Sequence, residues 1–212
     1  MRDLRVRDLL LGTMNASKSA QLLMKAYNLE QQGKKVMVFK PETDSRDGAF
    51  VISRALNDKR PAIVVPKDSD GSIMAENVWI KKPDIILVDE LQFFTESQVE
   101  KLAEISITFD VDIYAYGLLL SYTGKMFDAT KRAIESGFRI LTIDMSCDYC
   151  QNDATHHLLY VDGKLELDGS GIVVEDEEFK KKNQLYKSVC FSCFQRAIDV
   201  AEMEQIESKH KK

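Results

Sequence analysis

Residues 12–19, with the sequence GTMNASKS, have the composition of a loop that binds phosphate groups. They follow an apolar run at residues 9–11 and precede a segment with helical periodicity, which is the strand, loop and helix context of a P-loop. In a P-loop, consecutive backbone N–H groups face the phosphates, a lysine reaches the outer phosphates and a hydroxyl helps to hold Mg²⁺. Gly12, Lys18 and Ser19 supply three of these parts. The alternative is an ordinary strand-to-helix turn.

One position departs from the usual pattern G-x-x-x-x-G-K-[ST]. Ser17 stands where the second glycine belongs. Serine carries a Cβ that restricts φ where the chain must come very close to the phosphates. The substitution therefore predicts a strained loop or weaker nucleotide binding.

A second stretch whose side chains could take part in a reaction is the acidic pair Asp89 and Glu90, which ends a continuous apolar run at residues 85–88. Such a run is typical of a strand buried on both faces of a parallel sheet. An acidic residue at the carboxyl end of a central strand can face the P-loop metal. Asp89 fits this metal-facing position, the Walker B role, and Glu90 would then point toward the substrate. Acidic pairs also commonly end strands without any such role. The two motifs together favour nucleotide binding.

Four cysteines form the third group of residues that could bind a metal or react. Cys147 and Cys150 make one C-x-x-C pair and Cys190 and Cys193 make another, and the chain contains no further cysteine. This spacing fits a tetrahedral zinc site on two knuckles, with two dithiol redox pairs or unrelated thiols as alternatives. The pairs are far apart in sequence. The metal would therefore join the ends of a long segment that has few apolar residues for a core of its own, and would stabilise it as a small lobe.

Length and charge limit the possible classes of protein. The 212 residues suit one α/β domain with a smaller appendage. With 29 Lys+Arg against 34 Asp+Glu, the net charge is −5, which argues against a broad nucleic-acid-binding face. No apolar run approaches the roughly 20 residues that span a bilayer, and the charged N-terminus lacks the apolar region of a signal peptide. We therefore expect a cytoplasmic protein with no membrane or nucleic-acid partner.

The elements that must position these groups alternate between strand and helix, which predicts a mostly parallel sheet flanked by helices. The polar segment 40–57 is expected to be a turn-rich loop in which Asp44, Arg46 and Arg54 contact phosphates, brace the site or are merely solvated. Phe93 and its aromatic neighbour either floor a base-binding pocket or belong to the core. Helices are expected at residues 18–32, 72–80, 96–106 and 128–136, and strands at 36–39, 62–65, 112–116 and 139–144.

The composition changes after residue 144. Residues 160–174 are expected to form strands joined by glycine turns, and the charged residues 175–187 are expected to be mobile. The tail from residue 194 begins helical and frays, with a solvated His210. We expect a nucleotide-binding domain at residues 1–144, a zinc-binding lobe at 145–200 and a C-terminal tail at 201–212.

With these motifs in order, the chain resembles the type II thymidine kinases, a family with a P-loop core and a zinc-binding lobe. The resemblance runs through most of the chain, and the shared order and spacing of its motifs make it specific. The matching motifs are GTM followed by SKS, KPxxDxR at residues 40–46, SR at 53–54, DELQFF at 89–94, YGL at 116–118, the C-x-x-C at Cys147, and YKSVCFSC at 186–193.

The resemblance implies an α/β fold of the P-loop, RecA-like type and an ATP- and Mg²⁺-dependent transfer of the γ-phosphoryl group to the 5′-hydroxyl of thymidine, with structural Zn²⁺ and a homotetramer. It implies that Glu90 is the general base, which agrees with the need for a carboxylate to orient and deprotonate the attacking hydroxyl. It also implies a flexible lasso, here within residues 169–186, that closes over the base. The residues it implies for ATP and phosphate binding are Gly12, Thr13, Met14, Asn15, Ala16, Ser17, Lys18, Ser19, Asp89, Glu90 and Gln92. Those implied for the nucleoside pocket are Met14, Phe93, Leu118, Tyr122, Phe127, His157 and Tyr186.

Several positions depart from the family pattern besides Ser17. Ser121 and Tyr122 replace a frequent Asp-Phe, and His157 and Leu159 align with a threonine and an arginine. His157 could still donate a hydrogen bond to the base, whereas Leu159 carries no charge. The lasso is longer and more acidic than usual. These departures motivate an alternative, a catalytically weak relative that binds ATP or dTTP as a nucleotide sensor. A zinc-finger nucleic-acid binder is disfavoured, because neither C-x-x-C lies in a strongly basic, aromatic-rich context.

Overall fold

A computed structural model describes residues 5–45, 47–167, 169 and 183–210. Its contacts divide the chain into two compact units. The α/β unit comprises Met1–Gly12, Ser17–Leu119 and Phe127–Ile143. The cysteine unit comprises Thr13–Ala16, Leu120–Met126 and Asp144–Lys212. The middle of the phosphate-loop motif therefore groups with the cysteines rather than with the strand and helix that flank it.

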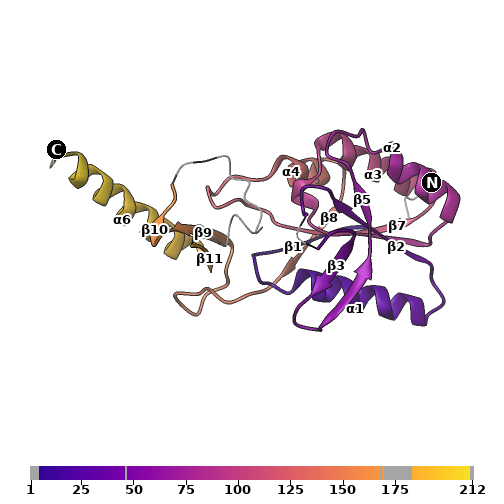
Figure 1. The fold of residues 1–212 in the computed structure, drawn as a ribbon, viewed down its shortest axis with the longest axis horizontal. Coiled ribbons are helices and arrows are strands. Elements are labelled where there is room, and N and C mark those ends of the chain that lie inside the picture. Colours follow the sequence, from indigo (N-terminus) through magenta and orange to yellow (C-terminus); the bar gives the residue numbers. More distant parts are fainter. Residues whose placement is uncertain (1–4, 46, 168, 170–182, 211–212) are drawn as a thin grey trace. The chain divides into compact units, whose positions relative to one another are not determined.

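The α/β unit is built on a six-stranded sheet in the order β5-β2-β6-β7-β1-β8, in which every neighbouring pair is parallel (Figure 1). Its fold therefore agrees with the predicted mostly parallel, helix-flanked sheet. The strands are β1 (Arg7–Gly12), β2 (Val36–Pro41), β5 (Ile63–Val65), β6 (Ile85–Val88), β7 (Asp112–Gly117) and β8 (Arg139–Ile143).

Helices cover both faces of this sheet. The helix α1 (Lys18–Gln31) lies on one face, and α2 (Ser72–Lys81), α3 (Glu96–Thr108) and α4 (Asp128–Glu135) lie on the other, as Figure 1 shows. Successive residues of β6 alternate between the two apolar layers: Ile86 and Val88 pack under α2 and α3, while Ile85 and Leu87 pack under α1. A strand that is buried on both faces must be apolar throughout, which explains the continuous run before the acidic pair.

Local sequence signals fix the ends of these helices. Thr95 caps α3 by accepting a hydrogen bond from the Gln98 N–H at its Oγ1, and Gln98 Oε1 accepts one from the Thr95 N–H. Gly33 follows α1 with φ of 76°, a conformation that glycine adopts without a Cβ clash, and its N–H bonds the Glu30 carbonyl. The predicted helix at residues 18–32 and the other three predicted helices are confirmed to within about two residues at each end.

The expectation of a loop throughout residues 40–57 was wrong. The structure has an antiparallel hairpin of β3 (Phe50–Ser53) and β4 (Asp58–Pro61), with exposed Arg54 at its turn. The hairpin is charged along β4, and Val51 is its fully buried apolar anchor, packed with the residues of α1. So little apolar periodicity does not identify a strand from sequence.

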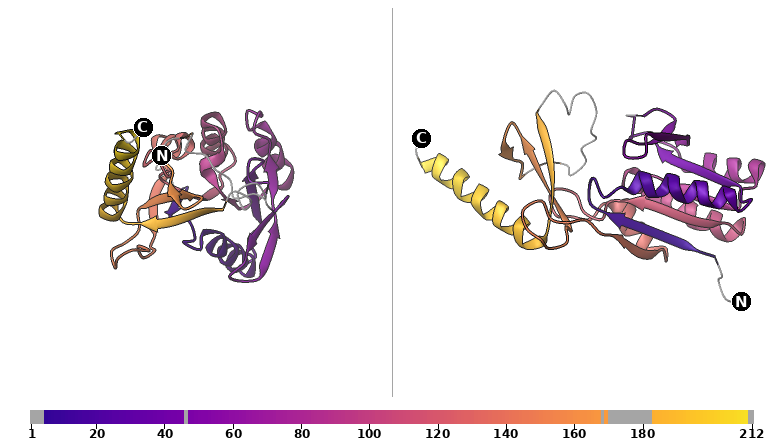
Figure 2. Two further views of the ribbon diagram at one scale, coloured as in Figure 1. Left: turned by 60° about the vertical axis from the view of Figure 1, so that its left-hand side comes forward. Right: turned by 90° about the horizontal axis from the view of Figure 1, so that it is seen from below.

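The cysteine unit contains a three-stranded antiparallel sheet in the order β10-β9-β11. Its strands are β9 (His156–Val161), β10 (Lys164–Leu165) and β11 (Gln184–Val189). The prediction that residues 175–187 are mobile was wrong for 184–187, which belong to β11, and its residues 175–182 lie outside the described part. The helix α6 (Phe191–His210) follows β11 directly and is the long yellow helix of Figure 2.

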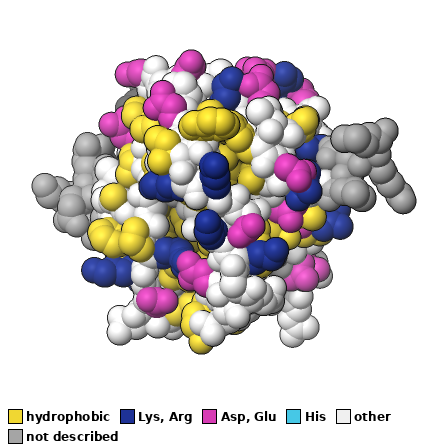
Figure 3. Space-filling model, turned by 90° about the vertical axis from the view of Figure 1, so that its right-hand side faces the viewer, with side chains coloured by type: hydrophobic (Ala, Val, Ile, Leu, Met, Phe, Trp, Pro, Cys, Tyr) yellow, Lys and Arg dark blue, Asp and Glu magenta, His cyan; other side chains and the backbone are white. Residues whose placement is uncertain are grey.

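This helix corrects the expected fraying tail, since it continues to His210, whose side chain lies outside the described part. Across residues 5–45, 47–167 and 183–210, no helix combines the length and the apolar character needed to cross a bilayer. On the face turned to the viewer in Figure 3, basic and acidic side chains are interspersed with hydrophobic ones. That mixture agrees with the small net charge of −5.

Candidate active site

The loop predicted from GTMNASKS connects β1 to α1. Lys18 Nζ donates to the Gly12 carbonyl at 3.3 Å, and the Gln21 N–H bonds the Ser17 carbonyl at 3.0 Å as α1 begins. Ser17 has φ of 57°, in the left-handed region that glycine adopts without penalty. The chain thus takes up at Ser17 the backbone conformation for which the usual glycine is suited, at a cost of roughly 1–2 kcal/mol.

The middle of the loop forms a compact turn within the cysteine unit. The Ala16 N–H donates to the Thr13 carbonyl at 3.2 Å, and both residues are buried. Asn15, at the tip, is exposed and has φ of 64°. Two residues with positive φ in so short a loop turn its backbone sharply, which is how a P-loop brings successive N–H groups to one side.

Asp89, at the end of β6, is buried and faces the start of α1. Its Oδ2 accepts from Ser19 Oγ at 3.4 Å, and its Oδ1 has no hydrogen-bond partner in the described part of the chain. Burial, together with the charges of Glu90 and Asp44, raises the pKa of Asp89 to about 7, although Lys18 opposes the shift. A buried carboxylate oxygen without a partner, beside a serine hydroxyl, fits the oxygen donors that Mg²⁺ requires.

A second buried carboxylate lies near Asp89. Asp44 is 4% exposed and pairs with the fully buried Lys40, with 3.0 Å between Oδ2 and Nζ. Lys40 Nζ also donates to the Phe50 carbonyl at 3.0 Å, so the β3–β4 hairpin helps to hold the lysine. The sequence motif KPxxDxR drew attention to the aspartate, whereas the lysine that pairs with it was missed. Arg46 of the same motif lies outside the described residues.

Glu90 has φ of 48° and ψ of 47°, which is a strained conformation for a non-glycine residue. Its Oε2 accepts from Gln92 Nε2 at 2.6 Å. The other end of the same amide, Gln92 Oε1, accepts from the Leu118 N–H at 3.0 Å, and the Leu118 carbonyl accepts from Thr130 Oγ1 at 2.8 Å. A chain of hydrogen bonds that starts on α4, buried as far as Gln92, therefore orients the Glu90 carboxylate. Thr130 was also missed, because nothing in its local sequence distinguishes it from other helical threonines.

Three of the predicted nucleoside-pocket residues belong to the α/β unit. The rings of Phe93 and Phe127 meet edge to face with their centroids 6.4 Å apart, and Leu118 is 8% exposed. Phe93 is half-buried, whereas its neighbour Phe94 is in the apolar core. Phe94 therefore belongs to the core, whereas for the half-buried Phe93 a place in a base-binding pocket stays a prediction.

The other four pocket residues belong to the cysteine unit. Tyr186 packs edge to face on His157 and also lies against the buried cluster of Tyr122 and Leu159. Leu159, which aligns with an arginine of the family, is 2% exposed, so an apolar contact replaces a charged group. His157 Nε2 accepts from the Met14 N–H at 2.9 Å and so cannot at the same time donate from that nitrogen to a base.

The lasso predicted at residues 169–186 lies mostly outside the described residues. Gly169, at its start, has φ of 143°, which other residues rarely adopt, and a Cβ there would clash with the Tyr122 hydroxyl oxygen unless that side chain shifted. Tyr122 Oη, the hydroxyl that distinguishes this chain from the family's frequent phenylalanine, therefore lies beside the first residue of the lasso.

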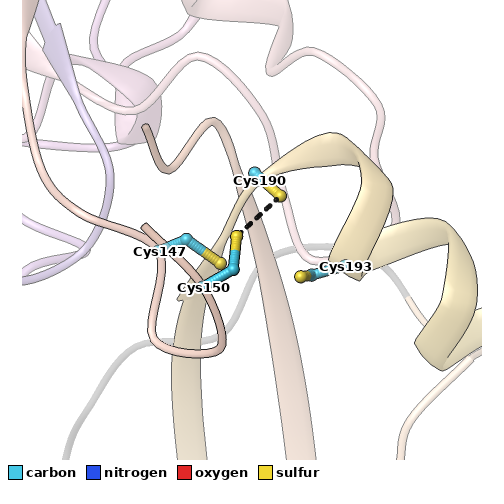
Figure 4. A group of neighbouring side chains, drawn as sticks. All are labelled: Cys147, Cys150, Cys190 and Cys193. Atoms are coloured by element: carbon cyan, nitrogen blue, oxygen red, sulfur yellow. Dashed lines mark hydrogen bonds between the residues drawn. The ribbon is translucent and has the colours of Figure 1, made fainter. Parts of the chain in front are cut away.

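The four cysteines converge at one point (Figure 4). Their sulfur atoms all lie within 4.8 Å of one another, and Cys150 and Cys190 are separated by 3.6 Å between Sγ atoms. A tetrahedron with zinc–sulfur bonds of about 2.3 Å has edges of roughly 3.8 Å, so the cluster has the size and the donor set of a structural zinc site. All four cysteines are free thiols rather than disulfides.

The surroundings of the cluster lower the pKa of Cys147 and Cys190 and raise the pKa of Cys150 and Cys193. Burial opposes ionisation of Cys147, but the backbone N–H groups of Cys190, Tyr149 and Cys150 outweigh it and lower the pKa of Cys147 to about 6. The loop that carries the first pair is closed by a 2.8 Å hydrogen bond from the Cys147 N–H to the Asn152 carbonyl. The second pair spans the end of β11 and the first turn of α6.

Comparisons with known proteins agree with this geometry. The family model described as "Thymidine kinase" matches residues 7–194. A thymidine kinase of Streptococcus gordonii is 33% identical over 179 residues, covering 84% of this chain and 90% of the relative, and one of Encephalitozoon cuniculi is 29% identical over 194 residues, covering 91% and 88%. Among solved structures, AMPPCP-bound DnaA from Aquifex aeolicus is 14% identical, with a TM-score of 0.39. The match covers 68% of this chain and 42% of that structure, and so slight a likeness says nothing about function.

Proposed function

The chain belongs to the thymidine kinase family, and we propose that it transfers the γ-phosphoryl group of ATP to the 5′-hydroxyl of thymidine. The observation that carries the proposal is the strand end where Asp89 meets Ser19 Oγ while the next residue, Glu90, is held by Gln92. One buried carboxylate for a cation and one oriented carboxylate for a proton are the two acidic groups that such a transfer requires.

The reaction assigns a step to each side chain. Glu90 accepts the proton of the thymidine 5′-hydroxyl while the 5′-oxygen of thymidine forms a bond to the γ-phosphorus. The bond between the γ-phosphorus and the β–γ bridging oxygen breaks, and its electron pair leaves with ADP. Lys18 and the backbone N–H groups of the loop neutralise charge on the phosphates. The strained backbone of Glu90 and its hydrogen bond to Gln92 support this role, because they fix the carboxylate before substrate binds.

Two metal ions complete the proposal. Ser19 and Asp89 would hold Mg²⁺, which supplies charge neutralisation at the phosphates, and the orphaned Asp89 Oδ1 supports that assignment. Structural Zn²⁺ would bind the four cysteines, and it would stabilise the cysteine unit rather than take part in the transfer.

The nucleoside would be recognised by apolar and aromatic groups. Phe93 and Tyr186 are half-buried rings of the kind on which a flat pyrimidine stacks. Met14, Leu118, Tyr122 and Phe127 would complete the pocket. His157 contributes by holding Met14 rather than by donating from Nε2 to the base.

The remaining expectations from sequence extend the proposal. They are a cytoplasmic homotetramer without nucleic-acid or membrane partners, a nucleotide-binding domain at residues 1–144, a zinc-binding lobe at 145–200 and a C-terminal tail at 201–212. Light scattering of the purified protein tests the assembly: a monomer would contradict it. Limited proteolysis followed by mass spectrometry tests the boundaries, with cleavage expected first near residues 144 and 200.

The activity is tested with a panel of ribonucleosides and deoxynucleosides, ATP and zinc-replete protein. We expect thymidine to be phosphorylated fastest, and Glu90→Gln to lose roughly 10²-fold or more of the rate because its amide cannot accept the proton. The same variant controls for contaminating kinases. If no nucleoside is phosphorylated while ATP still binds, the chain is a nucleotide-binding relative and the kinase proposal is wrong.

A further inference from the structure

The backbone of Met14, in the middle of the phosphate loop, is held on both sides by one strand pair. His157 Nε2 on β9 accepts from the Met14 N–H at 2.9 Å. Ser188 Oγ on β11 donates to the Met14 carbonyl at 2.9 Å. The two bonds involve successive peptide groups, one before and one after the Met14 Cα. We call His157 and Ser188 the Met14 clasp.

The clasp is a single rigid feature of the small sheet. His157 and Ser188 are direct cross-strand partners in the antiparallel pairing of β9 with β11. They are 2% and 3% exposed, so water competes little for their hydrogen bonds. Tyr186, two residues before Ser188 and on the same face of β11, packs edge to face on the His157 ring and limits its rotation.

The cysteine loop in turn fixes the backbone of Ser188. The Ser188 N–H donates to Asp148 Oδ2 at 3.0 Å, and the Ser188 carbonyl accepts from the Asp148 N–H at 2.8 Å. Asp148 lies between Cys147 and Cys150. Hydrogen bonds therefore run without a break from the C-x-x-C loop through Ser188 to Met14, which explains why Thr13–Ala16 group with the cysteine unit.

We propose that His157 and Ser188 are positioning residues that preorganise the phosphate loop for ATP through the backbone of Met14. This inference rests on the nucleotide-binding part of the proposed function. With the Met14 N–H and carbonyl both engaged, the backbone of the loop is fixed at this residue. Ordering a loop residue opposes nucleotide binding, and the clasp meets that entropic cost before the nucleotide arrives.

The test measures the dissociation constant of a nonhydrolysable ATP analogue with Mg²⁺ by calorimetry on the full chain with zinc. His157→Leu and Ser188→Ala should each weaken binding roughly tenfold, which corresponds to about 1.4 kcal/mol. His157→Gln should restore most of the affinity, because its Oε1 can accept the same bond. His156→Leu is the matched control: it makes the same change one residue earlier in β9, where the ring packs on Phe191 and Phe194 instead.

A spectroscopic readout separates positioning from general damage to the fold. An accepting Nε2 requires the neutral Nδ1–H form of His157, so ¹⁵N NMR of the nucleotide-free protein should show that tautomer. The Met14 amide signal should shift in His157→Leu and return toward its original position in His157→Gln. Unchanged affinity in both His157→Leu and Ser188→Ala, or an Nε2–H tautomer, would overturn the clasp. A wild-type protein that binds the analogue normally but phosphorylates no nucleoside would instead contradict the proposed kinase activity alone.

Discussion

The two units hold their functional groups in place by different means. In the α/β unit, Asp89 and Glu90 follow a strand that is buried between two apolar layers. Packing on that scale can support a desolvated carboxylate and a strained backbone. In the cysteine unit, the largest buried cluster is small and two of its five buried members are cysteines: Cys147, Leu158, Val189, Cys190 and Phe194.

The difference indicates where each unit can be damaged. In the α/β unit, backbone strain and buried charge lower the free energy of unfolding, but a large apolar core can offset that loss. With so small an apolar cluster, the cysteine unit would depend on the proposed zinc, as small metal-binding domains generally do. On this proposal, packing stabilises one unit and metal ligation the other, and the predictions below test this contrast.

The largest effect is expected from loss of the metal ligands. Cys190→Ser should unfold the cysteine unit, because structural zinc contributes roughly 10–16 kcal/mol in small zinc-binding peptides. Hydrogen exchange should show lost protection in β9 and β11 and retained protection in β6 and β7. Ser192→Ala, which changes an exposed neighbour, is the control. Retained protection of β9 in Cys190→Ser would show that packing alone holds this unit.

The next largest effect concerns the buried ion pair. Lys40→Met leaves the Asp44 carboxylate buried without its partner and should lower the free energy of unfolding by about 3–5 kcal/mol in urea titrations. Lys101→Met removes the same side chain from an exposed pair with Glu104 and should leave the free energy of unfolding nearly unchanged, because solvent screens that pair. Equal losses in the two variants would contradict a special role for burial at Lys40.

A smaller effect should follow the titration of Asp89. The pKa of Asp89 is about 7 in the folded chain against about 3.8 for an ordinary aspartate, so ionisation of this group disfavours the folded state. Stability without Mg²⁺ should therefore be highest below about pH 4 for this group, fall as the pH rises toward 7 and level off above it. Asp89→Asn should lack that decline and be more stable at pH 8 by on the order of 1–3 kcal/mol.

Thermal unfolding of zinc-replete, Mg²⁺-free protein across this pH range provides the measurement. The variant should also lose turnover, since an amide is a poor ligand for Mg²⁺. Parallel pH profiles for wild type and Asp89→Asn would show that burial of this carboxylate costs the fold nothing.

The smallest effect is expected at the loop itself. Ser17→Gly relieves a left-handed serine and should stabilise the protein by about 1 kcal/mol or tighten ATP binding severalfold. Asn57→Gly relieves a similar conformation, with φ of 50°, in the β3–β4 turn and should leave ATP affinity unchanged. Weaker ATP binding in Ser17→Gly would mean that the serine side chain itself contributes to the loop.

Local spacing predicted the parts of the site that lie close together in sequence. The loop from Gly12 to Ser19, the acidic pair after β6 and the two C-x-x-C pairs each carry their chemistry in a few consecutive residues. Strong apolar periodicity likewise predicted the sheet and its helices, because burial on one or two faces dictates that pattern.

Contacts between distant residues could not be predicted in this way. Ser188 lies 174 positions from Met14 and follows a charged stretch that resembles a disordered one. Lys40 is buried although lysine rarely is, and its partner only becomes evident once the chain turns. The strand β4 of the hairpin consists of three charged residues and a proline, so its sequence gave no strand pattern.

The central claim is that Glu90 carries the proton transfer while other groups bind the nucleoside. The most direct test measures thymidine binding by calorimetry and thymidine phosphorylation in the same preparations of wild type and Glu90→Gln. We predict that the dissociation constant for thymidine changes less than about threefold while turnover falls by roughly 10²-fold or more. Retained turnover in Glu90→Gln, or ATP hydrolysis that does not depend on thymidine in the wild type, would contradict the account.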